Sequence, residues 1–288
     1  MEREQLQSLE KFSVLMSLYE KEKPEYLKQC MKSILNQTVI PDQIVIVKDG
    51  PLTDELEAVL IDHVRKNPEL YTIVPLDVNR GLGLALAEGI LHCRYDLVAR
   101  MDTDDLSVKT RFECQLKEFK ADPELDICGS HIVEFEDDPR NIVSKRLVPL
   151  DDASIKEYQK RRDAFNHVTV MYKKSAVLEV GNYQSCLLME DTYLWVRMIQ
   201  NGVKCKNIEE PLVYVRIGKD MYERRGGISY FLKYKEGRKK VRETGYINSI
   251  DYYYTLVVQF IVALVPQNIR GWIFKKLLHK KCDRLSES

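Results

Sequence analysis

The chain has 288 residues, a length that suits one large α/β domain with a small appendage. Its 44 lysines and arginines balance 44 aspartates and glutamates, so no overall basic field favours a nucleic-acid partner. The seven cysteines are scattered and never spaced as Cys-x-x-Cys, which argues against a zinc site or a disulfide framework and for reduced thiols in the cytosol. Residues 1–11 are charged and lack the apolar core of a signal peptide.

The first half of the chain alternates short apolar runs with amphipathic helical patterns. Pro24 suits the first turn of a helix, and Thr53 is a helix-capping residue. Strands are expected at 12–18, 43–47, 71–74 and 97–102, and helices at 24–35, 54–65, 81–92 and 108–120. This alternation predicts βαβ units and a mostly parallel, Rossmann-like sheet flanked by helices.

The second half has shorter elements. Strands are expected at 142–148, 168–172, 203–208 and 212–217, and helices at 151–162 and from about 190 to 200, with Gly202 as the stop. Mixed strands after a parallel half indicate a continuation of the same sheet rather than an independent domain. We therefore divide the chain into residues 1–133, 134–225 and 226–288, the last being a helical tail.

The tail contains two amphipathic segments. Residues 250–266 are almost wholly apolar with three tyrosines at one end, but fall short of the roughly 20 residues that a transmembrane helix needs. Residues 270–281 mix Trp272 and Phe274 with four lysines, a pattern typical of an interfacial membrane helix. Two helices packed on the core would show a similar pattern, so both interpretations stay open.

An acidic cluster follows the fourth predicted strand. Asp102, Asp104 and Asp105 lie at its carboxyl end, which is the edge of an open α/β sheet where ligands bind. Two acids one residue apart can direct oxygens at one Mg²⁺ or Mn²⁺ ion, with substrate phosphates completing its shell. The alternative is an acidic turn in which Asp105 or Ser107 caps the next helix.

Two further polar loops are predicted at the same edge. Asp49 ends the second strand and could accept the imide N–H of a uracil ring, or simply form the turn before Gly50. Residues 79–83 open a helix, where anions are favoured, although Leu86 replaces the third glycine of a dinucleotide fingerprint. Together the three loops indicate a nucleotide-diphosphate site.

The chain resembles the inverting family 2 glycosyltransferases of the GT-A fold, particularly the bacterial branch that builds capsular polysaccharides and exopolysaccharides. The resemblance extends from residue 12 to about 225. Its motifs are Ser13–Tyr19, Ser33–Thr38, Val47–Gly50, Asn79–Gly83, Asp102–Asp105, Asn166–Met171 and Glu190–Asp191. One departure is Lys48, where the family usually has the first Asp of a pair; its partner Asp49 is kept.

The resemblance implies roles for individual residues. Asp102 and Asp104 would match the DxD metal ligands, with Mn²⁺ or Mg²⁺ bound and Asp102 directed towards ribose or metal. Asp191 would match the general base, with His167 and Glu190 on the acceptor side. The positions implied for nucleotide-sugar binding are Ser17, Tyr19, Asp49, Asn79, Arg80, Asp102 and Asp104.

These roles have simpler alternatives. Glu190 and Asp191 are also typical of a helix's first turn, and a lone histidine beside a strand is more often structural. Arg216 and the pair Arg224 and Arg225 could approach the diphosphate, or they could form a solvated charge cluster.

The implied function is transfer of a sugar from a nucleotide sugar, with uridine favoured, to a glycan or lipid-linked acceptor in cell-surface polysaccharide synthesis. The enzyme would be cytoplasmic and peripheral on the inner face of the cell membrane, without a nucleic-acid partner. Residues 1–133 would bind the donor, and 134–225 the acceptor. The alternatives are a sugar-1-phosphate nucleotidyltransferase, which would need a glycine-rich loop after the first strand, and a catalytically inactive membrane-surface binding module.

Overall fold

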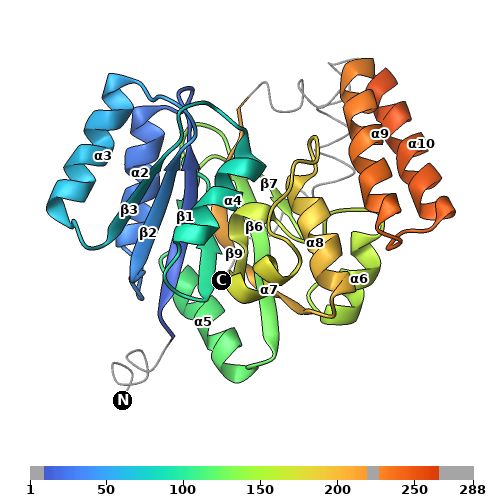
Figure 1. Ribbon diagram of the computed structural model, residues 1–288, viewed down its shortest axis with the longest axis horizontal. Helices are drawn as coiled ribbons and strands as arrows, with labels where there is room; N and C mark the ends of the chain where they lie inside the picture. Colours follow the sequence, from blue (N-terminus) through green and yellow to red (C-terminus); the bar gives the residue numbers. More distant parts are fainter. Residues whose placement is uncertain (1–9, 219–226, 266–288) are drawn as a thin grey trace.

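The computed structural model describes residues 10–218 and 227–265. Its described part is an α/β fold built on one nine-stranded sheet with helices on both faces (Figure 1). The first half contains β1 (Phe12–Leu18), α2 (Pro24–Leu35), β2 (Gln43–Lys48), α3 (Asp54–Lys66), β3 (Tyr71–Pro75), α4 (Leu82–His92), β4 (Leu97–Arg100), β5 (Leu106–Ser107) and α5 (Arg111–Ala121). The predicted α/β alternation is confirmed in this half.

The second half is mixed, as expected. It contains β6 (Leu125–Phe135), β7 (Ile142–Arg146), α6 (Asp152–Gln159), the 3₁₀ turn η1 (His167–Thr169), β8 (Met171–Lys173), α7 (Lys174–Glu179), α8 (Glu190–Gln200), β9 (Lys204–Arg216), α9 (Ile228–Glu243) and α10 (Ser249–Leu264). The boundary at 133/134 falls within β6, so the two halves share one continuous strand.

The strand order is β3-β2-β1-β4-β8-β6-β9-β5, with β7 paired to β6. Strands β1 to β4 are mutually parallel, so their carboxyl ends meet at one edge. The direction reverses at β8, which pairs antiparallel with both β4 and β6, while β6 and β9 are parallel. The sheet thus places β9 close to the end of β4, although the two strands are far apart in the chain.

Alternation along the buried strands gives the sheet two cores. Val14 and Met16 of β1 pack against the face covered by α2, α3 and α5. Leu15, between them, packs on the opposite face, under α4, α6, α7 and α8. Every residue of β1 except Ser17 is classed as buried, which explains its nearly unbroken apolar sequence.

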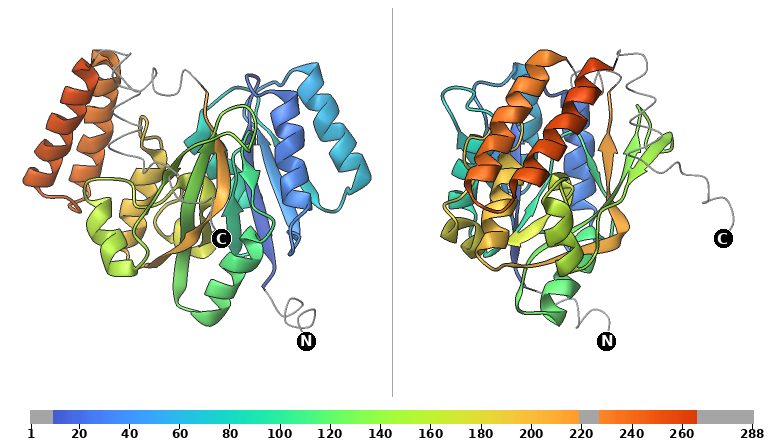
Figure 2. Two further views of the ribbon diagram at one scale, coloured as in Figure 1. Left: turned by 180° about the vertical axis from the view of Figure 1, so that it is seen from behind. Right: turned by 90° about the vertical axis from the view of Figure 1, so that its right-hand side faces the viewer.

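The α9–α10 hairpin forms a third layer outside α8, at one end of the molecule (Figures 1 and 2). Val241, Tyr252 and Leu256 form a small core with Val196 of α8. Thus residues 250–265 pack as a helix on the body of the protein, while the predicted segment 270–281 lies outside the described residues.

Several predicted boundaries differ from those of the structure, and three of the differences have an evident structural cause. The helix expected at 108–120 begins only at Arg111, because residues 106–108 pair with β9 instead, including a hydrogen bond from Val108 N to Leu212 O. Neither Asp105 nor Ser107 caps this helix; its N-cap is Thr110, without a side-chain hydrogen bond.

The other two concern strands. Val168 and Thr169, expected in a strand, form η1, where the Thr169 hydroxyl donates to Asn166 O at 2.8 Å. The two strands expected at 203–208 and 212–217 are one, β9, and Pro211 is accommodated by register irregularities against β6.

Candidate active site

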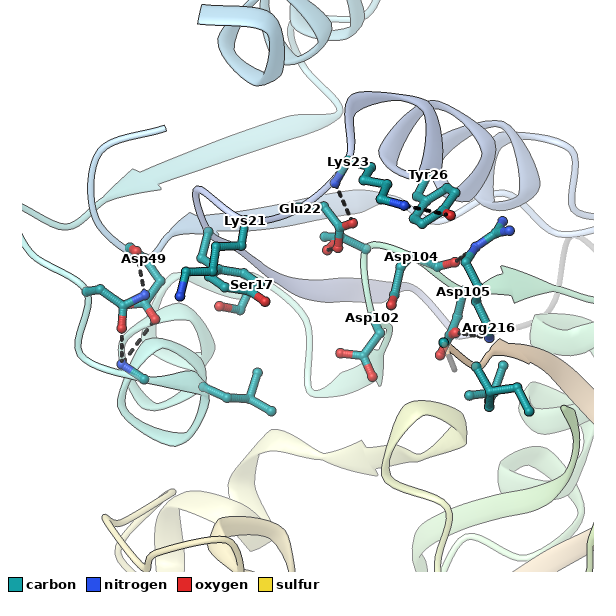
Figure 3. A pocket seen from close by; sticks show the side chains of 18 of the residues that line it. Ser17, Lys21, Glu22, Lys23, Tyr26, Asp49, Asp102, Asp104, Asp105 and Arg216 are labelled. Carbon is teal, nitrogen blue, oxygen red and sulfur yellow. Dashed lines mark hydrogen bonds between the residues drawn. The ribbon is translucent and has the colours of Figure 1, made fainter. Parts of the chain in front are cut away.

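A cavity of about 1190 Å³ opens at the carboxyl ends of β1, β2 and β4 (Figure 3). Of the predicted donor-binding residues, it is lined by Ser17, Tyr19, Asp49, Asn79, Asp102 and Asp104. The structure therefore brings together side chains from four separate loops, as the parallel sheet predicted. Arg80, His167, Glu190 and Asp191 do not line this cavity.

Asp49 fixes the loop that follows β3. Its carboxylate is almost fully buried and accepts the backbone N–H of Arg80 at 2.6 Å and of Gly81 at 3.1 Å. The Asn79 amide donates to Asp49 O at 3.2 Å. Each carboxylate oxygen keeps further acceptor capacity, so Asp49 can both hold this loop and accept a donor from a ligand. Arg80 contributes its backbone here.

The three acids after β4 converge. One carboxylate oxygen from each of Asp102, Asp104 and Asp105 lies within 4.8 Å of the others. Burial, together with the charges of Asp102 and Glu22, raises the pKa of Asp104 to about 7. Clustered carboxylates with too little compensating charge are the donor set that a hard divalent cation binds, and such an ion would favour their ionised forms. The residues present therefore fit Mg²⁺ or Mn²⁺.

Asp105 has a different environment from its two neighbours. Its side chain is buried and accepts the backbone N–H of Arg216 at 2.7 Å, which joins the acidic loop to the end of β9. Burial and the charge of Asp104 raise its pKa well above the ordinary value. Asp105 is thus the member of the cluster committed to internal structure.

Arg216 clamps the acidic loop, a role that neither interpretation of the sequence anticipated. Its guanidinium donates to Asp104 O at 3.0 Å, to Asp137 O at 2.9 Å and to Gln29 Oε1 at 2.8 Å. It also lies over the rings of Tyr26, at 3.9 Å, and Phe135, at 4.6 Å. So many fixed partners make Arg216 a structural support of the site.

Two site residues on the β1–α2 connection were missed. Glu22 accepts the Thr103 hydroxyl at 2.7 Å and so braces the middle of the Asp-x-Asp sequence. Lys21 extends between Asp49 and the acidic cluster (Figure 3). A signal was present in the sequence, because residues 20–23 are all charged and directly follow a strand that ends at the ligand-binding edge.

Glu190 and Asp191 begin α8, next to the first turn of α4. Glu190 packs so closely on Gly83 that a Cβ atom there would lie 2.6 Å from Glu190 Cγ. Burial and the nearby charge of Asp163 raise the pKa of Asp191 to about 7, while the Thr192 backbone N–H, at 2.8 Å, opposes this. A carboxylate with a pKa near neutrality is suited to general-base catalysis.

His167 lies within an aromatic cluster. Its Nε2 is 3.0 Å from the Tyr183 hydroxyl, and its ring centroid is 5.8 Å from that of Trp195. Burial and the charge of Arg100 hold the pKa of His167 well below its ordinary value, so the ring stays neutral near pH 7. Its role on the acceptor side stays a prediction.

An α/β sheet with an acidic cluster at the carboxyl end of a central strand is the arrangement expected of a GT-A glycosyltransferase. The profile of glycosyl transferase family 2 matches residues 13–181, more than half of the chain, so this protein belongs to that family and is a glycosyltransferase. The predicted family and fold are thereby confirmed.

Two bacterial relatives match nearly the whole chain. The UDP-Gal:alpha-D-GlcNAc-diphosphoundecaprenol beta-1,3-galactosyltransferase of Escherichia coli is 37% identical, over 94% of this chain and 97% of its own length. The amylovoran biosynthesis glycosyltransferase AmsE of Erwinia amylovora is also 37% identical, over 92% and 98%.

The fold recurs in a solved structure. The mannosyltransferase PcManGT from Pyrobaculum calidifontis, in complex with GDP-Man and Mn²⁺, superposes with a TM-score of 0.62 at 15% identity, over 88% of this chain and 70% of its own.

Proposed function

We propose that this glycosyltransferase uses a UDP-sugar and a divalent cation to extend a lipid-linked saccharide with inversion at the anomeric carbon, in cell-surface polysaccharide synthesis. The observation that carries the proposal is the convergence, in one cavity, of Asp49 with the Asp102–Asp104 pair. The full-length similarity to the E. coli galactosyltransferase supports a UDP-linked donor and a diphospholipid acceptor.

The donor would span the cavity from Asp49 to the acidic cluster. Asp49 retains acceptor capacity for the imide N–H of uracil, and Ser17, Tyr19 and Asn79 line the same cavity. Lys21 lies between the two ends, where its ammonium group can meet the diphosphate (Figure 3). Asp104 and Asp102 would hold Mn²⁺ or Mg²⁺, which neutralises the charge developing on the departing diphosphate.

Asp191 would take the proton from the acceptor hydroxyl. The new glycosidic bond forms as the acceptor oxygen attacks the anomeric carbon, and the bond to the diphosphate oxygen breaks on the opposite face, which inverts configuration. A carboxyl whose pKa is about 7 is largely ionised in mildly alkaline solution and still basic enough to accept this proton.

Membrane contact would occur through α10. Its outward side chains form one apolar stripe at helical spacing, comprising Ile250, Tyr253, Tyr254, Val257, Val258, Ile261 and Leu264. Ring contact between Phe231 and Phe260 shows that the hairpin is antiparallel, with the C-terminal half of α10 beside the start of α9. Among the described helices, none is long and apolar enough to span a bilayer. We therefore propose a cytoplasmic protein on the inner membrane face.

The test is calorimetric binding of UDP and UDP-sugars to the full chain with and without Mn²⁺. We expect metal-dependent binding, and a donor at a hundredfold excess over its dissociation constant should stabilise the fold by about 2.7 kcal/mol. Asp104→Asn should abolish the metal dependence while the melting temperature of the ligand-free protein is kept or raised, because a partly buried, repelled carboxylate is removed. Equal metal-dependent UDP binding by this variant would remove Asp104 from the site.

A further inference from the structure

Arg100 is a buried cation directly behind the wall of the donor cavity. It is the last residue of β4, it is 1% exposed, and its guanidinium does not line the cavity. Its Nη2 lies 2.5 Å from Oδ1 of Asp102, whose own side chain is 40% exposed and does line the cavity. A charge buried on one side thus contacts a carboxylate that faces the ligand on the other.

The root of the Arg100 side chain is held by its backbone. Arg100 N donates to Val170 O at 2.9 Å, and Arg100 O accepts from Arg111 Nη2 at 2.7 Å. The backbone of Arg100 is therefore set by β4 and its neighbours. Its side chain is 2% exposed and that of Asp102 is 40% exposed, so the guanidinium has less room to move than the carboxylate.

The hydrogen bonding of Arg100 is unusual when it is compared with that of Arg111, a second arginine buried in the same region. Each nitrogen of the Arg111 guanidinium has a neutral acceptor: Nε donates to Gln115 Oε1, Nη1 to Ser107 Oγ and Met101 Sδ, and Nη2 to Arg100 O. Arg100 instead has buried Nε and Nη1 atoms without a hydrogen-bond partner among the described residues. Burying a guanidinium with two unsatisfied donors is unfavourable, so its packing alone gives no reason for an arginine here.

Arg100 contacts one carboxylate directly, although its charge acts on several neighbours. The ionisable groups that interact with it are Asp102, Asp104, Asp105, Arg111, His167, Tyr172 and Tyr183. His167 stays neutral, and Asp105 is already committed to the Arg216 backbone. Asp102 is the carboxylate that forms a direct ion pair with this cation.

We infer that Arg100 is a positioning residue of the donor site, which holds one oxygen of Asp102 and so fixes the other towards the ligand. The inference rests on the proposed function. The two aspartates of the Asp-x-Asp pair then have different roles. Asp104 is the principal metal ligand. Asp102 has one oxygen bound to Arg100 and directs the other towards ribose or metal.

A double-mutant cycle tests this role. Arg100→Met, Asp102→Asn and the double variant are compared with the wild type for UDP affinity in saturating Mn²⁺. If Arg100 acts through Asp102, each single substitution should lower UDP affinity about tenfold. The double variant should bind UDP no more weakly than the single variant with the lower affinity. Arg100→Lys retains charge but not the planar guanidinium, and should recover only part of the loss.

Arg238→Met is the matched control, since it removes a comparably buried arginine of α9 that donates to Thr255 Oγ1 and Lys160 O and does not line the cavity. It should lower the melting temperature, and its effect on UDP affinity should multiply with that of Asp102→Asn instead of overlapping. Multiplicative effects of Arg100→Met and Asp102→Asn, or unchanged UDP affinity in Arg100→Met, would overturn the inference. Failure of the wild type to bind UDP would instead refute the proposed function.

Discussion

At the scale of single residues, Asp191 combines the two properties that a base in this reaction needs. It begins a helix next to the donor loop, where its carboxylate is held by the Thr192 N–H, and it has a pKa of about 7 because burial and Asp163 disfavour its charge. The positive charge of Arg146 lowers the pKa of Asp191, but it does not offset burial and the negative charges of Asp163 and Glu190. The carboxylate is therefore more basic than a solvent-exposed aspartate.

Asp191→Asn should reduce single-turnover sugar transfer by about 10²–10⁴-fold, because an amide cannot accept the hydroxyl proton. UDP affinity should be nearly unchanged, since the lost interaction serves the acceptor in the transition state. In the wild type, kcat/KM should rise with pH through about 7 as Asp191 ionises. A variant with full activity and only a lower melting temperature would make Asp191 a structural acid of the first helical turn.

The raised pKa of Asp191 should make activity rise with pH, but it should make the folded protein less stable as pH rises. A carboxyl with a folded pKa of about 7 and an unfolded pKa near 4 binds more protons in the folded state, so the free energy of unfolding falls as pH rises between these values. Asp104 adds a contribution of the same sign in metal-free protein. Asp191→Asn should therefore remove only part of the decline, which urea unfolding at several pH values would measure.

At the scale of elements, the contact between α4 and α8 links the donor loop to Asp191, the proposed base. Gly83→Ala should place a Cβ within 2.6 Å of Glu190 Cγ and 2.9 Å of Glu190 Cβ, so the start of α8 must shift. Overpacking of this kind typically costs about 1–3 kcal/mol, partly offset by the helix propensity of alanine. We expect kcat to fall at least tenfold, because about 1.4 kcal/mol of lost transition-state positioning already gives that factor.

Gly89→Ala is the matched control, since it overpacks the same helix at Leu15 and Val47, on the core side. Both variants should lower the melting temperature, and only Gly83→Ala should reduce kcat beyond what the lost folded fraction explains. If the two variants have equal kcat values at a temperature where both are folded, the contact between α4 and α8 does not position Asp191 for catalysis.

The elements of the parallel half were predictable because local signals and tertiary packing agree there. Pro24 opens α2, Thr53 caps α3, and β1 is apolar because both of its faces are covered. Beyond β4, the strand with which a segment pairs determines its secondary structure. Residues 106–108 carry helix-compatible sequence yet pair with β9, a strand more than a hundred residues further along the chain.

The candidate site also has residues that the sequence predicts and residues that it does not. Asp49, Asp102 and Asp104 could be predicted from their positions at strand ends. The supporting roles of Glu22, through Thr103, and of Arg216, over Tyr26, could not, because each depends on a contact between segments distant in sequence. A carboxylate at the end of a strand can be recognised from the local sequence, whereas the residues that hold it in place are known only from the fold.

At the scale of the whole molecule, the outward face of α10 is the surface through which we propose that the enzyme contacts the membrane. Val257→Glu with Ile261→Glu should weaken binding of the full chain to anionic vesicles at least tenfold in sedimentation, because burying each such side chain is worth about 1.5–3 kcal/mol. Both side chains are 58% exposed, so the fold should persist. Ile61→Glu places the same chemistry at a 62% exposed site on α3 and should leave binding unchanged. No vesicle binding by the wild type would exclude membrane attachment through α10.

The hydrogen bond from Arg216 to Asp105 also bears on the order in which the protein is made. The ribosome delivers Asp102, Asp104 and Asp105 well before β9, yet the acidic loop is braced by Arg216 at the end of that strand. Closing so long a loop is entropically expensive and slows the formation of such contacts. A nascent chain can therefore assemble β1 to β4 early and still lack an ordered donor site. We therefore expect a nascent chain to bind the nucleotide only after translation has passed Arg216, when the acidic loop gains this support.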